Sequence, residues 1–240
     1  MNMKWTQAFH RLLFQASYSL VGKASVIRLN EEFMETQWWP YNRLLETQVE
    51  QLQRLIRFAY DHVQYYRRLF DSRGLKPSDI RSLQDLQKLP ILTKQIIRQH
   101  GAEMAPKNLN ALKYVLGSTG GSTGEPLQYL MSTEDLARGI ALLYRGWGYA
   151  GYRPGDRLAI IAGSSLIPTA RSKLRKWLIS VARNVQYYSS YGMSDGTLSH
   201  YVYTLNRFRP KFLRGYASSI YTVACFIRDR NLDLRFRPRA

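Results

Sequence analysis

The sequence has 240 residues, of which 45% are hydrophobic and 13% aromatic, a composition that can bury a core and excludes wholesale disorder. Its single cysteine, Cys225, excludes a disulfide framework and a cysteine-based zinc or iron–sulfur site. The 35 basic and 17 acidic side chains give a formal net charge of +18, which indicates an anionic partner.

The positive charge is concentrated in the second half of the chain. Residues 136–240 carry 18 basic and only 4 acidic side chains. The excess has three interpretations: a nucleic acid or membrane surface, an anionic small ligand, or acidic residues that a longer protein would supply. Because the basic residues are scattered and form no polybasic run, no nucleic-acid partner is expected. We also expect few buried ion pairs in this half.

No uncharged stretch reaches the ~18–20 residues that a membrane-spanning helix requires. His10 and Arg11 interrupt the first apolar stretch, which disfavours a secretory signal peptide. These features and the single cysteine predict a cytoplasmic protein. Apolar residues at helical spacing between Thr6 and Leu20 predict a helix, which either packs on its own domain or makes a peripheral contact with a membrane.

Further helices are expected up to about residue 100. Pro40 follows two tryptophans and predicts a bend, because the residue before a proline avoids helical geometry. Apolar residues at i, i+3/i+4 and i+7 between Gln48 and Phe70 predict one continuous helix. Residues 75–100 contain two prolines and are expected to form small helices joined by loops.

Beyond Ala111 the hydrophobic pattern changes from helical spacing to alternation. Residues 112–116 and 127–131 each alternate as a strand does, and the segment between them is rich in Gly, Ser and Thr. This arrangement predicts a hairpin. Thr133 then precedes two acidic residues, a pattern typical of a helix N-cap.

From residue 158 onward, short apolar segments alternate with amphipathic ones. The alternation predicts an α/β fold with a mainly parallel sheet flanked by helices, and the N-terminal helices precede this sheet. The expected strands are residues 158–162, 185–188 and 211–215, and the expected helices are residues 173–182, 194–207 and 218–229.

The most informative segment is the glycine- and hydroxyl-rich loop of residues 117–126, which contains four glycines. Glycine reaches positive φ at little steric cost, so several backbone N–H groups can point toward one position. Hydroxyl side chains add uncharged donors. Together these groups suit phosphate oxygens, as an anion-binding nest does; an ordinary solvent-exposed loop is the alternative.

The sequence contains three matches or near-matches to known motifs, and the residues around each one show whether the motif applies. A Walker A loop requires Lys after its last glycine, whereas Glu125 follows Gly124. Residues 146–151 match the dinucleotide pattern G-x-G-x-x-G, but they end a predicted helix instead of following a strand. Residues 120–124 match the nucleophile elbow G-x-S-x-G, which would make Ser122 a hydrolase nucleophile. The residues after this match read as a strand, whereas an elbow leads into a helix.

The loop also resembles a family signature. Its residues 119–126 (Thr-Gly-Gly-Ser-Thr-Gly-Glu-Pro) are similar to the phosphate loop of adenylate-forming (acyl-activating) enzymes. Within that superfamily, the flanking sequence resembles the phenylacetate–coenzyme A ligase branch and its capsular-polysaccharide-biosynthesis (CapK-like) relatives. The segments that carry this resemblance are residues 55–63, 65–67, 83–90, 93–94, 155–157, 209–210 and 215–219.

The resemblance implies a domain organisation. Residues 47–240 would form the front half of an adenylate-forming, AMP-binding domain, and residues 1–46 a preceding helical segment. The family's later elements, such as its Tyr-Gly-x-Thr-Glu segment, are not found, so we expect a truncated protein that is inactive on its own. Residues 191–195 imitate that segment, but they lie before the Gly-Tyr-x-Ser element instead of after it, and no role is assigned to them.

The resemblance also implies an activity, namely ATP-dependent conversion of a small carboxylate to an acyl-adenylate and transfer of the acyl group to a thiol. ATP, Mg²⁺ and coenzyme A are the implied cofactors. The loop is expected to hold the departing pyrophosphate through hydroxyl donors and backbone N–H groups. These cofactor-binding residues are Thr119, Gly120, Gly121, Ser122, Thr123 and Gly124. No catalytic residue and no metal ligand is assigned.

Several assignments remain open at the level of the sequence. Tyr216 and Ser218 are expected to line the cleft, with core packing as the alternative for the tyrosine. The alternative functions are a basic membrane-surface or scaffold protein that retains the fold, and a serine hydrolase that uses Ser122. The four histidines lack metal-ligand spacing, and Cys225 lies on an apolar helix face, so these side chains are expected to be structural. The acyl substrate and the oligomeric state are not determined.

Overall fold

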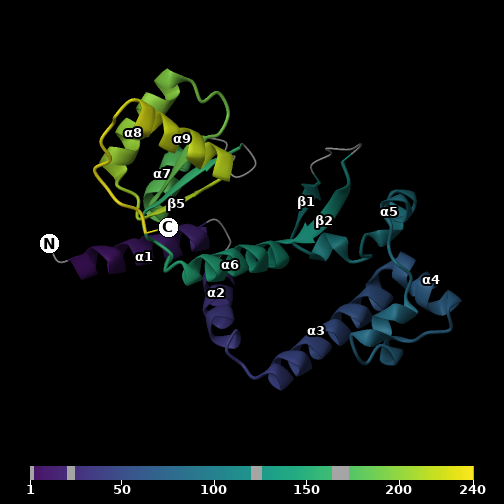
Figure 1. Ribbon diagram of the computed structural model, residues 1–240. Helices are drawn as coiled ribbons and strands as arrows, with labels where there is room; N and C mark the ends of the chain where they lie inside the picture. The colour runs from purple at the N-terminus through teal and green to yellow at the C-terminus, as the bar shows by residue number, and fades with distance from the viewer. Residues whose placement is uncertain (1–2, 21–24, 120–125, 164–172, 240) are drawn as a thin grey trace. The chain divides into compact units, whose positions relative to one another are not determined.

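The computed structural model describes residues 3–20, 25–119, 126–163 and 173–239 (Figure 1). The chain divides into two compact units, one comprising residues 1–30 and 140–240 and the other residues 31–139. We call these unit 1 and unit 2. The expected boundary between residues 46 and 47 followed the extent of the family resemblance rather than packing, and it stays a prediction.

The N-terminal part of the chain is helical, as expected. Its helices are α1 (Met3–Leu20), α2 (Ser25–Thr36), α3 (Tyr41–His62) and α4 (Gln64–Ser72). Helix α2 ends shortly before the two tryptophans and α3 begins directly after Pro40, so the predicted bend is confirmed. No helix within the described ranges combines the length and the apolar composition that crossing a membrane requires.

The single helix expected over Gln48–Phe70 is wrong, because the chain breaks at Val63 between α3 and α4. Val63 has extended geometry, with φ of −113° and ψ of 112°, and it forms an isolated antiparallel bridge with Pro106. The N–H of Lys107 also donates to the carbonyl of His62 at 2.8 Å. This tertiary pairing draws one residue out of the helix, which the apolar spacing does not reveal.

Short helices complete the helical part of unit 2 and confirm the expectation for residues 75–100. They are η1 (Pro77–Asp79), η2 (Gln84–Lys88), α5 (Lys94–His100), η3 (Gly101–Met104) and η4 (Leu109–Ala111). The core beneath them contains Ile56 from α3, Phe70 from α4 and Ile80 after η1. These apolar contacts hold the segment around η1 against the long α3.

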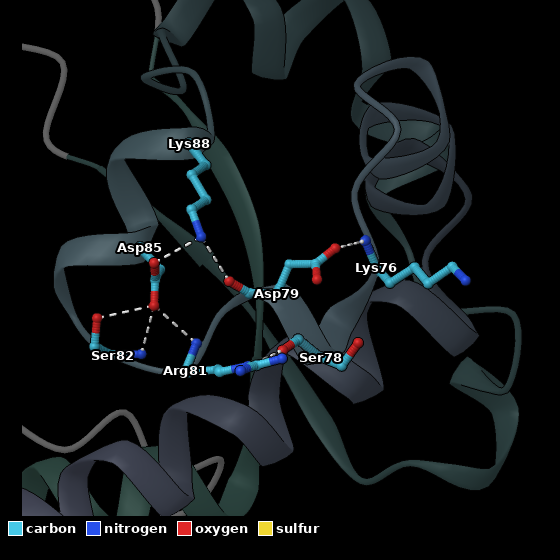
Figure 2. Close-up of polar contacts among 7 residues, drawn as sticks. All are labelled: Lys76, Ser78, Asp79, Arg81, Ser82, Asp85 and Lys88. Atoms are coloured by element: carbon cyan, nitrogen blue, oxygen red, sulfur yellow. Dashed lines mark hydrogen bonds and ion pairs between the residues drawn. The ribbon is translucent and has the colours of Figure 1, made fainter.

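A polar network around Asp85 fixes the segment that joins η1 to η2 (Figure 2). The Asp85 carboxylate pairs with Lys88 Nζ at 2.7 Å and accepts hydrogen bonds from the Ser82 hydroxyl and from the backbone N–H groups of Ser82 and Arg81 at 2.9–3.0 Å. Lys88 also donates to the carbonyl of Asp79 at 2.9 Å. The bond from Lys88, and then those from Ser82 and Arg81, lower the pKa of Asp85 well below its usual value.

The predicted hairpin is confirmed. Strands β1 (Tyr114–Ser118) and β2 (Gln128–Ser132) pair antiparallel, and helix α6 (Thr133–Tyr149) follows at once. The expected N-cap at Thr133 is one residue too late. The hydroxyl of Ser132 accepts the N–H of Asp135 at 3.0 Å and donates to its carboxylate at 2.7 Å, so Ser132 caps the helix.

Unit 1 contains the parallel sheet that the sequence predicts. Its strands β3 (Leu158–Ala162), β4 (Val185–Ser189) and β5 (Phe212–Gly215) run parallel in the order β4-β3-β5. The helices that follow strands β3, β4 and β5 are α7 (Lys173–Arg183), α8 (Asp195–Phe208) and α9 (Ala217–Asp229), respectively. All five residues of β3 are buried, as expected for a central strand that is covered on both faces.

The chain covers the two faces of this sheet with different helices. Ala159 and Ile161 of β3 pack against α8 and α9, whereas Leu158, Ile160 and Ala162 face Tyr residues from the α6 side. The connections explain this division. The connection from β3 to β4, which contains α7, moves across the sheet in one direction, and the connection from β4 to β5, which contains α8, moves in the other. Because both crossovers are expected to be right-handed, α7 and α8 lie on opposite faces of the sheet.

A cluster of tyrosines lies between α1, α6 and the sheet. The hydroxyl groups of Tyr18 and Tyr144 are hydrogen-bonded at 2.6 Å, and the ring of Tyr144 stacks on Tyr152. The Tyr152 hydroxyl is buried without a hydrogen-bond partner among the described residues. Burial raises the pKa of both Tyr144 and Tyr152, so their neutral forms are strongly favoured in the folded unit.

The described residues of the basic half form few buried ion pairs, as expected. Within its described residues, ion pairs join Lys211 to Asp156, Arg228 to Asp229 and Arg230 to Asp195, and both of the last two lie on the surface. Arginines lie on aromatic rings instead. Arg183 lies 4.0 Å from the ring centre of Tyr18, and Arg214 lies 4.6 Å from that of Trp147. Such contacts stabilise a cation without a carboxylate.

Candidate functional site

The glycine- and hydroxyl-rich loop joins the two strands of the hairpin in unit 2. Of the ten residues 117–126, the first two belong to β1, so the loop itself begins at Thr119. Thr119 is described and exposed, whereas the other expected binding residues lie outside the described residues: Gly120, Gly121, Ser122, Thr123 and Gly124. The N–H of Thr119 donates to the carbonyl of Leu127 at 3.0 Å, and the N–H of Leu127 donates to Thr119 Oγ1 at 2.9 Å. Two hydrogen bonds therefore close the base of the loop.

This closure leaves Thr119 with one donor. Its backbone N–H is already used, whereas its hydroxyl accepts a hydrogen bond and has no acceptor for its own hydrogen among the described residues. Below it, Gly117 lies opposite Tyr129, and a Cβ at Gly117 would lie 2.5 Å from that ring. Only glycine lets the tyrosine ring cross the strand at this position.

The hairpin also bears on the alternative use of Ser122 as a nucleophile. A nucleophile elbow is a sharp turn from a strand into a helix. Here the segment that contains Ser122 leads from β1 into the antiparallel strand β2, and the next helix begins only at Thr133. The flanking structure therefore does not fit the hydrolase pattern. The rejected match at residues 146–151 ends helix α6 and does not follow a strand, as expected.

A cavity of about 1020 Å³ in unit 2 opens beside the hairpin. Its walls include Leu116 and Leu130 from the strands and Leu55 and Ile97 from α3 and α5. Leu127, which closes the loop with Thr119, also lines it. The volume and the largely apolar walls match those of small-molecule sites, so the base of the loop borders a space that can hold an apolar group.

A second candidate surface lies in unit 1, at the carboxyl end of the parallel sheet. In open α/β sheets ligands bind outside this end, where the strand order reverses. Here β3 is the central strand, and the chain runs from it first to β4 on one side and then to β5 on the other. Gly163 follows β3, Tyr191 follows β4 and Tyr216 follows β5. A Cβ at Gly163 would lie 3.0 Å from the hydroxyl of Tyr191, and one at Gly215 would lie 2.4 Å from the carbonyl oxygen of Ile161.

The two expected cleft residues lie at this end of the sheet. Tyr216 directly follows β5 and is exposed, so the alternative that it packs in the core is wrong. Ser218 is exposed in the first turn of α9. Tyr191 has no role assigned from the sequence, and Gly163 is not among the expected site residues. Their position immediately after expected strand ends is the signal that could have identified them.

The remaining candidates of the sequence form no site. Among the described residues, no group of three or more His, Cys, Asp or Glu side chains could hold a metal ion. Cys225 is half-buried on α9 and close to the Tyr221 hydroxyl.

Comparison with known proteins finds relatives over most of the chain. No family model matches. CapK of Staphylococcus aureus is 27% identical over 199 residues, and phenylacetate–coenzyme A ligase of Thermus thermophilus is 28% identical over 202 residues. Each alignment covers 83% of this chain, but only 44% and 43% of the respective relative. The chain thus spans less than half the length of these relatives.

Solved structures share the fold. An open conformation of 2-hydroxyisobutyryl-CoA ligase, in complex with 2-HIB-AMP and CoA, matches with a TM-score of 0.57 at 20% identity. The match covers 84% of this chain and 46% of that one. The chain is therefore similar in sequence to CapK and phenylacetate–coenzyme A ligase along most of its length, and it shares its fold with 2-hydroxyisobutyryl-CoA ligase.

Proposed function

We propose that this chain binds ATP through the loop that begins at Thr119 and serves in the activation of a small carboxylate. The observation that carries the proposal is the closed base of the loop, where Thr119 and Leu127 exchange two hydrogen bonds and an exposed hydroxyl remains available. The relatives named phenylacetate–coenzyme A ligase support the same chemistry. The chain alone is expected to bind the nucleotide without completing the reaction.

The proposed reaction has two steps. A carboxylate oxygen attacks the α-phosphorus of ATP, the bond to the bridging oxygen breaks, and pyrophosphate departs with additional negative charge. A thiol, for which coenzyme A is the proposed donor, then attacks the acyl carbonyl and AMP leaves. Positioning and electrostatic stabilisation supply most of the catalysis of phosphoryl transfer. The reaction therefore requires hydrogen-bond donors that are already in position around the departing phosphates.

The loop residues are proposed to supply these donors. The hydroxyl groups of Thr119, Ser122 and Thr123 would donate to phosphate oxygens. Backbone N–H groups would come from the loop glycines, which are Gly120, Gly121 and Gly124. Because its N–H is bonded to Leu127, Thr119 would contribute its hydroxyl alone. With no suitable acidic cluster among the described residues, Mg²⁺ would be held by the phosphates of the nucleotide, and no step is assigned to it.

Calorimetric titration of the chain with ATP and with pyrophosphate tests the proposal. Thr119→Val is expected to weaken binding about tenfold, because it removes a hydrogen bond to a charged phosphate. Thr119→Ser keeps the hydroxyl and is expected to bind like the wild type. Ser118→Ala is the matched control, because that hydroxyl lies one residue before the loop and its hydrogen bond among the described residues is to the carbonyl of Thr119, at 3.4 Å.

Two outcomes would contradict the proposal. One is the absence of ATP and pyrophosphate binding by the folded chain, and the other is unchanged binding by Thr119→Val. Covalent labelling of Ser122 by a phosphonate probe would instead support the hydrolase alternative.

A further inference from the structure

Helix α7 of unit 1 exposes its apolar stripe to solvent. The stripe has the spacing i, i+3, i+4, i+7 of an amphipathic helix, a pattern that ordinarily faces the core. Its members are Leu174, Trp177, Leu178 and Val181, with exposed fractions of 66%, 60%, 52% and 47%. The half-buried residues of the helix lie between them, at Ile179, Ser180 and Ala182. The side of α7 that carries the large apolar residues is therefore its outer side.

The charge of α7 is entirely positive. The helix contains Lys173, Arg175, Lys176 and Arg183 and no acidic residue. Arg183 is turned toward the tyrosine cluster, where its guanidinium lies over the ring of Tyr18 and its Nε donates to a serine hydroxyl of α1. The other three basic residues fall within the same four-residue segment as Leu174. An exposed apolar stripe thus shares its helix with a concentration of cations.

Little acidic charge is available within residues 136–240 to neutralise these cations. Residues 136–240 contain four acidic residues, and three of them form ion pairs elsewhere. Those pairs join Asp156 to Lys211, Asp195 to Arg230 and Asp229 to Arg228. The positive charge that α7 carries in its sequence therefore favours an anionic binding partner for this helix.

The surface beside α7 extends the apolar area. A groove of about 610 Å³ is lined by Trp177 and Val181 of the stripe together with Val185 and Tyr187 of the edge strand β4. Helix α1, which packs against α7, contributes His10 to the groove and also exposes two large apolar side chains. Exposed apolar areas of this kind mark contact surfaces for proteins or membranes.

We propose that the outer face of α7 binds the surface of an anionic phospholipid bilayer, with the helix lying in the plane of the membrane interface. A basic helix with an exposed Trp and Leu stripe has the composition that interfacial binding requires, because apolar side chains enter the headgroup region while Lys and Arg contact anionic lipids. A second copy of the chain fits less well, since each copy has a net charge of +18 and like charges repel. The inference does not depend on the proposed ATP binding.

Co-sedimentation with lipid vesicles tests the proposal. The wild-type chain is expected to bind vesicles of phosphatidylcholine that contain about one quarter phosphatidylglycerol, and to bind pure phosphatidylcholine much more weakly. Raising the salt concentration to about 0.5 M should release most of the protein. Trp177→Ser should lower the partition coefficient about tenfold, since a largely buried indole is lost from the interface.

The matched control is Tyr221→Ser, which removes an aromatic side chain that is 68% exposed on α9. It is expected to bind vesicles like the wild type. Circular dichroism establishes that both variants are folded, and ATP titration of both separates this proposal from the proposed function. The triple variant Lys173→Gln, Arg175→Gln, Lys176→Gln should lose the preference for anionic vesicles while the apolar stripe stays intact.

A second measurement identifies the residue that enters the membrane. Brominated phospholipids quench tryptophan at short range, so they should quench part of the wild-type fluorescence. Trp177→Phe should still bind vesicles but lose most of that quenching. The proposal is overturned if neutral and anionic vesicles bind equally, if Trp177→Ser binds like the wild type, or if Trp177→Phe is quenched as strongly as the wild type. Binding of an acidic polypeptide such as polyglutamate without vesicle binding would also overturn it.

Discussion

Replacement of Gly215 by alanine tests the close packing of β5 against β3 in the parallel sheet of unit 1. A Cβ at this position would lie 2.4 Å from the carbonyl oxygen of Ile161 and 3.2 Å from its Cβ. The first distance is far shorter than any van der Waals contact, and the oxygen belongs to the backbone of the central strand β3. That strand is paired on both sides and cannot move away without disturbing β4 or β5.

The expected loss of stability follows from this geometry. Overpacking of a core typically costs about 1–3 kcal/mol, and a clash with a doubly paired backbone belongs at the upper end, so Gly215→Ala should lower the free energy of unfolding by about 3 kcal/mol. Gly146→Ala is the matched control in the same unit. Gly146 lies within helix α6, and a Cβ added there would meet no atom within 4 Å, so alanine should stabilise the chain by about 0.5–1 kcal/mol.

Urea unfolding followed by circular dichroism measures both variants. With an m-value of about 2–3 kcal/mol/M, Gly215→Ala should lower the unfolding midpoint by about 1 M. Hydrogen exchange of peptides from β3 should then show faster exchange in this variant. The reasoning is refuted if Gly215→Ala keeps the wild-type midpoint, or if Gly146→Ala loses as much stability as Gly215→Ala.

Three further predictions concern buried or networked polar groups. Tyr152→Phe removes a buried hydroxyl that has no partner among the described residues, so it should raise the free energy of unfolding by about 0.5–1 kcal/mol. Tyr144→Phe breaks the 2.6 Å hydrogen bond to Tyr18 and should lower the free energy of unfolding by about 1 kcal/mol. Equal effects of the two variants in urea unfolding would contradict this prediction. Because burial raises the pKa of Tyr144 and Tyr152, their stabilising contribution is complete below about pH 10 and lost above it, so absorbance titration should show both ionising only as unit 1 unfolds. The lowered pKa of Asp85 means that its contribution is present above about pH 4 and lost as the pH falls further; the stability difference between the wild type and Asp85→Asn should therefore shrink in acid, and a difference that stays constant down to low pH would contradict the assignment.

Sequence patterns predicted most of the architecture because those elements are determined locally. The alternating residues of the hairpin and the strand–helix alternation after residue 158 correspond to real strands and helices. The errors arose where a distant contact decided the outcome. Val63 leaves the helix because it pairs with Pro106, 43 positions further along the numbering. The cap at Ser132 in place of Thr133 is a smaller error, since hydroxyl residues occupy both positions.

The candidate surfaces were predictable only in part. The composition of the loop identified Thr119 as a donor, but the pairing with Leu127 that consumes its backbone N–H depends on the register of the hairpin. The proximity of Tyr191 to Gly163 could not be predicted from the sequence, because it depends on the order of the strands in the sheet. Helix α7 was expected to be amphipathic, yet periodicity does not say which side faces inward, and its outward apolar stripe could not be foreseen.

The hydrogen bonds between Thr119 and Leu127 make the alignment of the two strands independent of the sequence of the loop between them. They fix the alignment of β1 with β2 at the base of the loop, so changes between these two residues need not shift that alignment. Lengthening a loop whose ends are already joined is inexpensive, since each doubling of its length costs only about 0.6 kcal/mol of closure entropy. If the loop binds a ligand as proposed, substitution and even insertion within this segment would therefore change its selectivity while the supporting strands remain unaltered.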